Sequence, residues 1–190
     1  MSPFGQTRFG VRIGPCSVLP GQDIYLLTII DYFSRFIVAW GIVKSVSQRE
    51  VQNLLALAYM SEDIDRKVTK PMIRFDQGSP NMAHSTRRLI EELEMLFSPA
   101  RSHRPTDNGR QERWYRTVKQ EEIYCYPTYP TEETARDALE KYIYEYNERR
   151  PHQALLNFTP GACSRGWKQK PALRPVQKTG TNCQRATDRL

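Results

Sequence analysis

Two apolar runs stand out in the first quarter of the chain. Residues 24–30 read IYLLTII and residues 36–43 read FIVAWGIV, with a short polar segment between them. Uninterrupted runs of this length, rich in β-branched and aromatic residues, are typical of buried strands. The pattern predicts a hairpin of two buried strands. A further strand is expected at 10–19, where Gly14 and Pro15 interrupt the alternation.

Beyond the hairpin the apolar period becomes helical. Ser47, followed three residues later by Glu50, resembles a capping box before a helix whose apolar positions continue to Tyr59. The elements expected after this helix are a strand at 72–75, a helix at 81–95, an extended piece at 96–97, and helices at 110–124 and 131–150, the last ended by Pro151. Antiparallel strands that lead into alternating helices and strands predict a mixed α/β domain with no internal repeat.

The charge balance points to a polyanionic partner. Lys and Arg number 28 against 21 Asp and Glu, which gives a formal net charge of +7, and nucleic acid is the first candidate. Residues 164–190 carry +6 of this and lack periodicity, so we expect a core domain at 1–163 and a basic disordered tail at 164–190. The tail is either only solvated or a non-specific phosphate contact.

Composition also excludes some classes of protein. No apolar run is long enough for a membrane span, and the first residues lack a secretory signal, so we expect a cytoplasmic protein with reduced cysteines. The cysteines form no CxxC pair, and only three histidines accompany them, which argues against a zinc knuckle.

Two carboxylates lie where chemistry is plausible. Asp76 directly follows the predicted strand at 72–75, and the carboxyl ends of strands are where open α/β sheets gather ligands. Glu112 lies near the start of a predicted helix among basic residues. Taken singly, each has a simpler local explanation, since Asp76 can cap a turn and Glu112 can interact with the helix dipole.

The spacing of these two carboxylates suggests a family. Thirty-five residues separate Asp76 from Glu112. Together with four ordered motifs, this resembles the catalytic core of the DDE transposases and retroviral integrases over residues 6–162. The motifs are TIIDYFSRFIVAW at 28–40, RFDQGS at 74–79, PTDNGRQERWYRTVKQEEIY at 105–124 and YNERRPHQALLNFTP at 146–160.

The resemblance implies a ribonuclease-H-like fold, a mixed five-stranded sheet flanked by helices. It also implies DNA integration or transposition by metal-dependent phosphodiester cleavage and strand transfer, with DNA and further copies of the chain as partners. Two Mg²⁺ or Mn²⁺ ions would activate the attacking oxygen and stabilise the leaving oxygen. Asp76 and Glu112 would each hold one ion.

One carboxylate of the family is missing. Family members carry a bridging Asp on the first strand, near residues 6–12 here, and this stretch reads QTRFGVR without an acid. Arg8 or Thr7 would occupy the position, and a guanidinium cannot ligate a cation. Asp31 matches a different position of the family, so we do not expect it to replace the missing bridging ligand. The alternative interpretation is a catalytically inactive DNA-binding remnant.

The beginning of the chain also lacks the helix-turn-helix region that precedes such cores. With the missing carboxylate, this suggests a truncated or decayed reading frame. A third and weaker alternative is a protein that binds RNA or anionic surfaces through its basic tail alone.

Basic residues beside Glu112 are the candidate DNA contacts. Arg116 and Lys119 follow Glu112 by four and seven residues and share its helical face, and Arg110 and Arg113 lie on the same predicted helix. The resemblance implies phosphate contacts there. Farther on, residues 149–152 match the family's YN…RPH motif, and we expect Arg150 and His152 to pack the final helix against the sheet.

Overall fold

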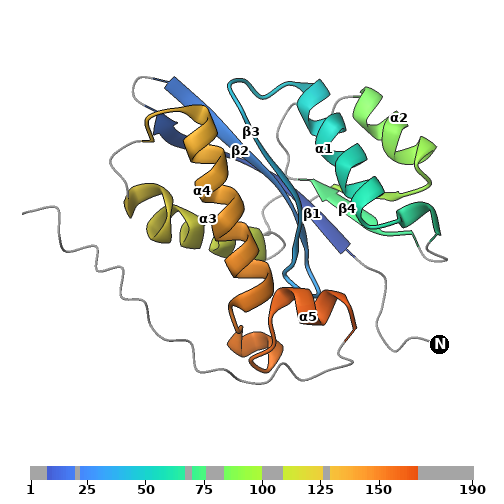
Figure 1. Cartoon of the computed structure of the whole chain (residues 1–190). Helices are drawn as coiled ribbons and strands as arrows, with labels where there is room; N and C mark the ends of the chain where they lie inside the picture. The colour runs from blue at the N-terminus through green and yellow to red at the C-terminus, as the bar shows by residue number, and fades with distance from the viewer. Residues whose placement is uncertain are drawn as a thin grey trace, which may run out of the picture.

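The computed structural model describes residues 8–19, 22–66, 70–75, 84–99, 109–125 and 129–166. A mixed sheet in the order β3-β2-β1-β4-β5 forms its centre (Figure 1). The strands are β1 Arg8–Leu19, β2 Gln22–Asp31, β3 Ile37–Val43, β4 Met72–Phe75 and β5 Leu96–Pro99. Strands β1, β2 and β3 pair antiparallel, whereas β4 pairs parallel with β1 and with β5.

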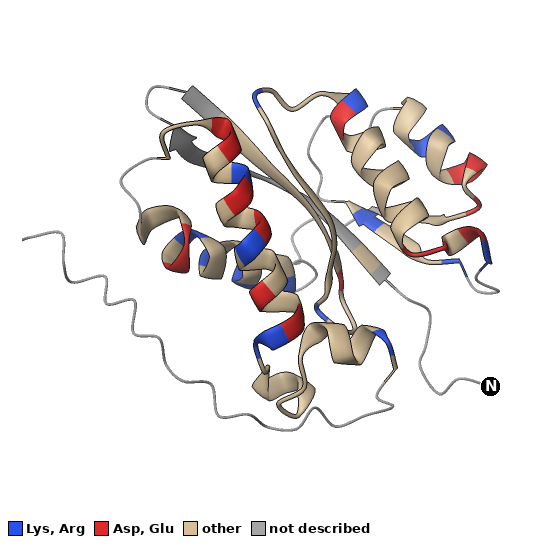
Figure 2. Cartoon of the chain, in the orientation of Figure 1, with Lys and Arg blue, Asp and Glu red and all other residues tan. Residues whose placement is uncertain are grey.

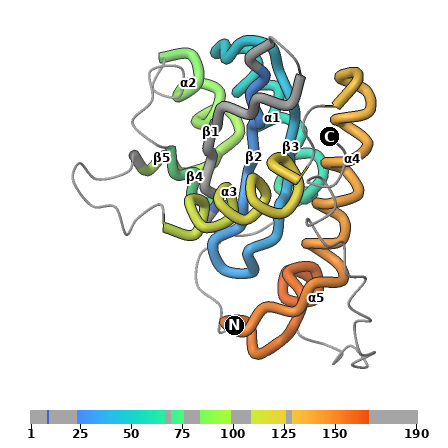
Figure 3. The backbone as a smooth tube through the Cα atoms, turned by 90° about the vertical axis from the view of Figure 1, so that its left-hand side faces the viewer, coloured from blue at the N-terminus to red at the C-terminus, as the bar shows by residue number. Residues whose placement is uncertain are grey.

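Helices cover both faces of this sheet. They are α1 Gln48–Ser61, α2 His84–Glu92, α3 Gly109–Glu121, α4 Glu132–Tyr144 and α5 Pro160–Ser164. Helices α1 and α2 lie on one side, while α3 crosses the other side next to α4 (Figures 1 and 3). The mixed α/β class expected from the sequence is therefore confirmed.

The sheet separates two apolar cores. Ile24, Leu26 and Ile30 of β2 pack with α3 and α4, and Leu27 and Ile29 of the same strand pack with α1 and α2. Successive strand residues point to opposite faces, so β2 is buried on both sides. This explains why its sequence is an unbroken apolar run.

Strand β1 tolerates a proline because its pairing changes along its length. Its parallel pairing with β4 extends only from Arg8 to Val11. Pro15 lies beyond that point and pairs with Tyr25 of β2. On the side of β4, β1 is unpaired at Pro15 within the described residues, and a proline lacking its N–H is accepted at such an edge.

The predicted cap at Ser47 is confirmed, whereas α2, α3 and α4 end before the expected residues 95, 124 and 150. Ser47 accepts a hydrogen bond of 3.3 Å from the Glu50 amide and caps α1. The helix expected to run to Arg150 instead leaves α geometry at Tyr144 and continues as a π-helical turn at Glu145–Arg149. This wider turn buries Asn147 against the start of β3, a contact that local sequence does not reveal.

Some expectations fall outside the described residues. They concern Thr7, Asp76 and the tail beyond residue 166. Among the helices that the structure describes, none has the length and apolar character needed to cross a membrane.

Candidate active site and nucleic-acid interface

The turn from β2 to β3 is built around Asp31. Its carboxylate accepts hydrogen bonds from the amides of Phe33 and Ser34, at 3.1 and 3.0 Å, and from the Ser34 hydroxyl. Asp31 is buried, and both of its carboxylate oxygens are engaged by the turn. The Asp31 carboxylate therefore stabilises the β2–β3 turn.

Buried polar contacts attach α3 to the sheet. The Tyr115 hydroxyl donates to the Leu26 carbonyl of β2 at 2.7 Å and lies 3.2 Å from the Thr28 hydroxyl. At the start of the helix, the Tyr32 hydroxyl donates to Gln111 at 3.0 Å. Because these groups are buried, a displaced helix would lose hydrogen bonds without gaining water. They hold the helix that carries Glu112.

Helix α3 turns Glu112 toward solvent. Its buried positions include Gln111, Trp114 and Tyr115, whereas Glu112 and Arg116 are exposed. Arg116 and Lys119 follow Glu112 by about one and two helical turns. The structure thus keeps the predicted carboxylate and two of the predicted DNA contacts on one helix face, and Figure 2 shows basic positions along α3.

The other two predicted DNA contacts lie elsewhere on the helix. Arg110 and Arg113 line a cavity together with Arg35 of the β2–β3 turn. The Arg110 guanidinium donates to the Tyr32 carbonyl. Sequence analysis did not single out Arg35, because its proximity to α3 depends on the turn built by Asp31.

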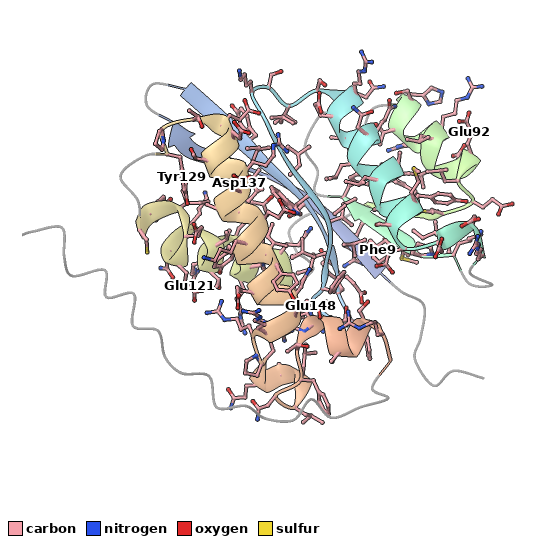
Figure 4. The ribbon with its side chains drawn as sticks, viewed as in Figure 1. Phe9, Glu92, Glu121, Tyr129, Asp137 and Glu148 are labelled. Atoms are coloured by element: carbon pink, nitrogen blue, oxygen red, sulfur yellow. The ribbon has the colours of Figure 1, made fainter. Side chains whose placement is uncertain are left out.

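The YN…RPH segment packs differently from the expectation. Arg150 forms an ion pair with Glu121, near the end of α3, at 2.6 Å, and Figure 4 labels Glu121 there. Asn147 contacts the sheet, whereas Arg150 joins the segment to α3. His152 packs edge-on against Tyr146, with ring centroids 4.9 Å apart.

Strand β1 pairs with β4 along four residues next to the predicted position of the missing carboxylate. Arg8 pairs with Met72, the first residue of β4, and Val11 pairs with Phe75, the last. Asp76 follows Phe75 in the sequence and lies outside the described residues, so the β1 residue next in register is Arg12. Arg12 is therefore a further candidate for this position, beside Arg8 and Thr7 of the sequence analysis.

The described residues do not present the ligand set of a bridged pair of ions. Strand β1 contains no acidic residue, and within the described residues no three potential ligands cluster closely enough to hold a metal. The ligands predicted from the sequence, Asp76 and Glu112, are two carboxylates, whereas the family resemblance implies three. A guanidinium at Arg12 would repel a cation rather than bind it.

Comparisons with known proteins agree on one family. Two family models, both described as integrase core domain, match residues 13–105 and 94–160. An uncharacterized protein of insertion element IS136 from Agrobacterium fabrum is 30% identical over 145 residues, covering 74% of this chain and 73% of that protein. The transposase for insertion sequence element IS904 of Lactococcus lactis is 28% identical, covering 79% of this chain and 59% of the transposase.

Solved structures share the fold. The catalytic core domain of BIV integrase superposes with a TM-score of 0.63 at 15% identity, covering 84% of this chain and 93% of that one. The HTLV-2 integrase catalytic core domain in complex with magnesium has a TM-score of 0.61 at 13% identity, covering 85% of this chain and 97% of that one. With the matched family models and the IS136 relative, this shows that the chain belongs to the integrase core domain family of DDE transposases and retroviral integrases.

Proposed function

We propose that this integrase core acts in DNA integration or transposition, with Asp76 and Glu112 as its catalytic, metal-binding carboxylates. The observation that carries the proposal is the solvent-facing side of α3, where Glu112 shares a helix face with Arg116 and Lys119. This arrangement supports a DNA phosphate bound next to a carboxylate. Mg²⁺ or Mn²⁺ is the proposed cofactor.

The sequence of β1 favours a second candidate function. Arg12 follows Val11, which pairs with the last residue of β4, and we propose that a third carboxylate would be needed at Arg12 to complete the ligand set. A core with this substitution binds DNA in a transposition complex without cutting it. In both functions α3 contacts phosphates, and only the second leaves the native chain inert as a nuclease.

Partners follow from the family. DNA is the proposed substrate, and self-association is proposed because one related structure is a dimeric form of an integrase core. The chain spans 59% of the length of the Lactococcus transposase. We therefore propose, for this chain, that it takes part in the complete transposition reaction. The basic segment at 164–190 is proposed to add non-specific phosphate contacts.

Nicking of supercoiled DNA with Mg²⁺ or Mn²⁺ distinguishes the two functions. The variants are the native chain, Arg12→Asp and Glu112→Gln. Exposed Arg88 and Glu92 of α2 provide matched controls as Arg88→Asp and Glu92→Gln, because they pair with each other at the surface. Native nicking abolished in Glu112→Gln supports cleavage by the chain itself. Nicking found only in Arg12→Asp supports the second function.

A further inference from the structure

A cavity of about 580 Å³ lies beside α3 and is lined by several positively charged side chains. Four arginines from three segments border it: Arg35 of the β2–β3 turn, Arg110 and Arg113 of α3, and Arg150 after the π-helical turn. Glu112 does not line it. Glu112 follows Arg110 by two residues, about 200° around the helix, so the cavity and the carboxylate face are separate surfaces of α3.

The positive charge of the cavity is only partly neutralised. Arg150 is paired with Glu121, the one carboxylate among the described residues that line the cavity. Arg110 donates to the Tyr32 carbonyl, which leaves its charge uncompensated. In the described part of the chain, neither Arg35 nor Arg113 has a carboxylate within ion-pair distance. Clustered cations without counter-charges favour an anionic ligand.

Two buried ring nitrogens of residues that line the cavity also lack hydrogen-bond partners in the described part of the chain. The indole nitrogen of Trp114, whose side chain is only 3% exposed, has no hydrogen-bond partner among the described residues. His152, which also lines the cavity, has no partner at Nε2 among the described residues. Trp114 and His152 both line the cavity, so their rings are positioned to report on binding there. Phosphate oxygens accept hydrogen bonds from guanidinium groups, and four arginines line this cavity.

The backbone at Arg35 supports a functional reason for the cluster. Arg35 adopts a left-handed conformation with φ of 62°, which is unfavourable for a residue other than Gly, Asn or Asp. The Arg35 amide is held by a 2.7 Å hydrogen bond to the Asp31 carbonyl. The turn thus holds an arginine in a strained conformation at the cavity, and such strain is concentrated at functional sites.

Electrostatics within the cavity agree with this arrangement. Burial lowers the pKa of Arg35, and although Tyr146 opposes this change, Arg110 and Arg113 lower the pKa further. Burial lowers the pKa of His152 to about 4, with Arg35 and Arg150 adding to the effect. An anion bound in the cavity would stabilise the charged forms of the Arg35 and His152 side chains.

We propose that this cavity binds a phosphate group of a DNA strand, at a site separate from the carboxylate face of α3. The amino-terminal end of α3, at Gly109 and Arg110, also borders the cavity and adds the positive end of a helix dipole. The source of the phosphate rests on the proposed function, because DNA is the substrate of that function. The alternative source with the same chemistry is free inorganic phosphate.

The test follows the Trp114 indole N–H by NMR in the full chain. The chain has three tryptophans, so a Trp114→Phe variant assigns the resonance. Short duplex DNA and inorganic phosphate are titrated separately at constant ionic strength. The site variant is Arg35→Asn with Arg113→Gln, since Asn tolerates the left-handed backbone. The control of equal charge change is Arg88→Gln with Arg136→Gln, at two exposed arginines.

The expected result is an indole shift with DNA that is abolished in the site variant and retained in the control. The salt dependence of DNA affinity should also fall by about 0.9 in log–log slope for each phosphate that the site variant no longer neutralises. An indole unmoved by DNA and by phosphate overturns the proposal, and a shift with inorganic phosphate alone overturns DNA as the source. If the chain does not nick DNA, the proposed catalytic role is contradicted, but the NMR test of phosphate binding in the cavity is unaffected.

Discussion

Replacing Asn147 with Ala tests how the segment after α4 is attached to the sheet. The Asn147 amide donates to the Ile37 carbonyl at 3.0 Å, and its carbonyl oxygen accepts from the Ile37 amide at 2.9 Å. Both residues are buried, and β3 is an outer strand of the sheet. Asn147 therefore supplies the pair of hydrogen bonds that a neighbouring strand would otherwise make.

The magnitude follows from the two backbone groups left behind. Each buried group without a partner costs ~1–3 kcal/mol, so Asn147→Ala should lower the free energy of unfolding by about 2–6 kcal/mol. A typical domain has about 5–15 kcal/mol in total, so the loss would be readily measured. Asn147→Asp should also be costly, because it retains the acceptor for the Ile37 amide but places a carboxylate oxygen against the Ile37 carbonyl.

Urea unfolding followed by circular dichroism provides the measurement. The matched control is Asn53→Ala on the exposed side of α1, which should change stability by about 0.5 kcal/mol or less. If Asn147→Ala costs no more than this control, the paired hydrogen bonds do not hold the π-helical turn to β3, and the reasoning is refuted.

Three further changes test other parts of the structure. Gly161→Ala would place a Cβ 2.5 Å from a carboxylate oxygen of Glu148, which pairs with Arg165; we expect thermal melting to show a loss of stability that the added Glu148→Ala change reverses. Tyr115→Phe removes the hydrogen bond to β2, and urea unfolding should show a loss of about 1–2 kcal/mol; an unchanged midpoint would contradict the role given to that bond. The depressed pKa of His152, about 4 in the folded chain, predicts that stability falls as pH drops from about 6.5 toward 4, because the unfolded chain binds the proton first. His152→Gln should flatten this part of the stability–pH curve.

The elements set by local sequence were predictable. The apolar runs of β2 and β3 and the Ser47 cap of α1 depend on neighbouring residues, and the structure confirms them. The π-helical turn was not predictable in this way, because its cause is the contact between Asn147 and Ile37, 110 residues apart. A helical pattern alone continues through such a point.

In the candidate site, too, some features follow from local sequence and others depend on the fold. Glu112, Arg116 and Lys119 share a helix face because of their spacing, which the sequence shows directly. The cluster of Arg35 with Arg113 requires the β2–β3 turn to meet α3, and no local pattern indicates that meeting. The position of Arg12 depends on the register between β1 and β4, which is a property of the sheet and not of either strand alone.

The central claim is that an integrase core carries Asp76 and Glu112 as catalytic carboxylates and has Arg12 where a third is needed. The most direct measurement is metal-dependent nicking of supercoiled DNA by Arg12→Asp, compared with the native chain and with Arg12→Asp combined with Glu112→Gln. The account predicts that Arg12→Asp nicks faster than the native chain on the order of 10-fold or more, since even groups that only orient metal ligands contribute ~10–100-fold. The double variant should lose this gain. A folded Arg12→Asp chain no faster than the native one, or a double variant as fast as the single, would contradict the account.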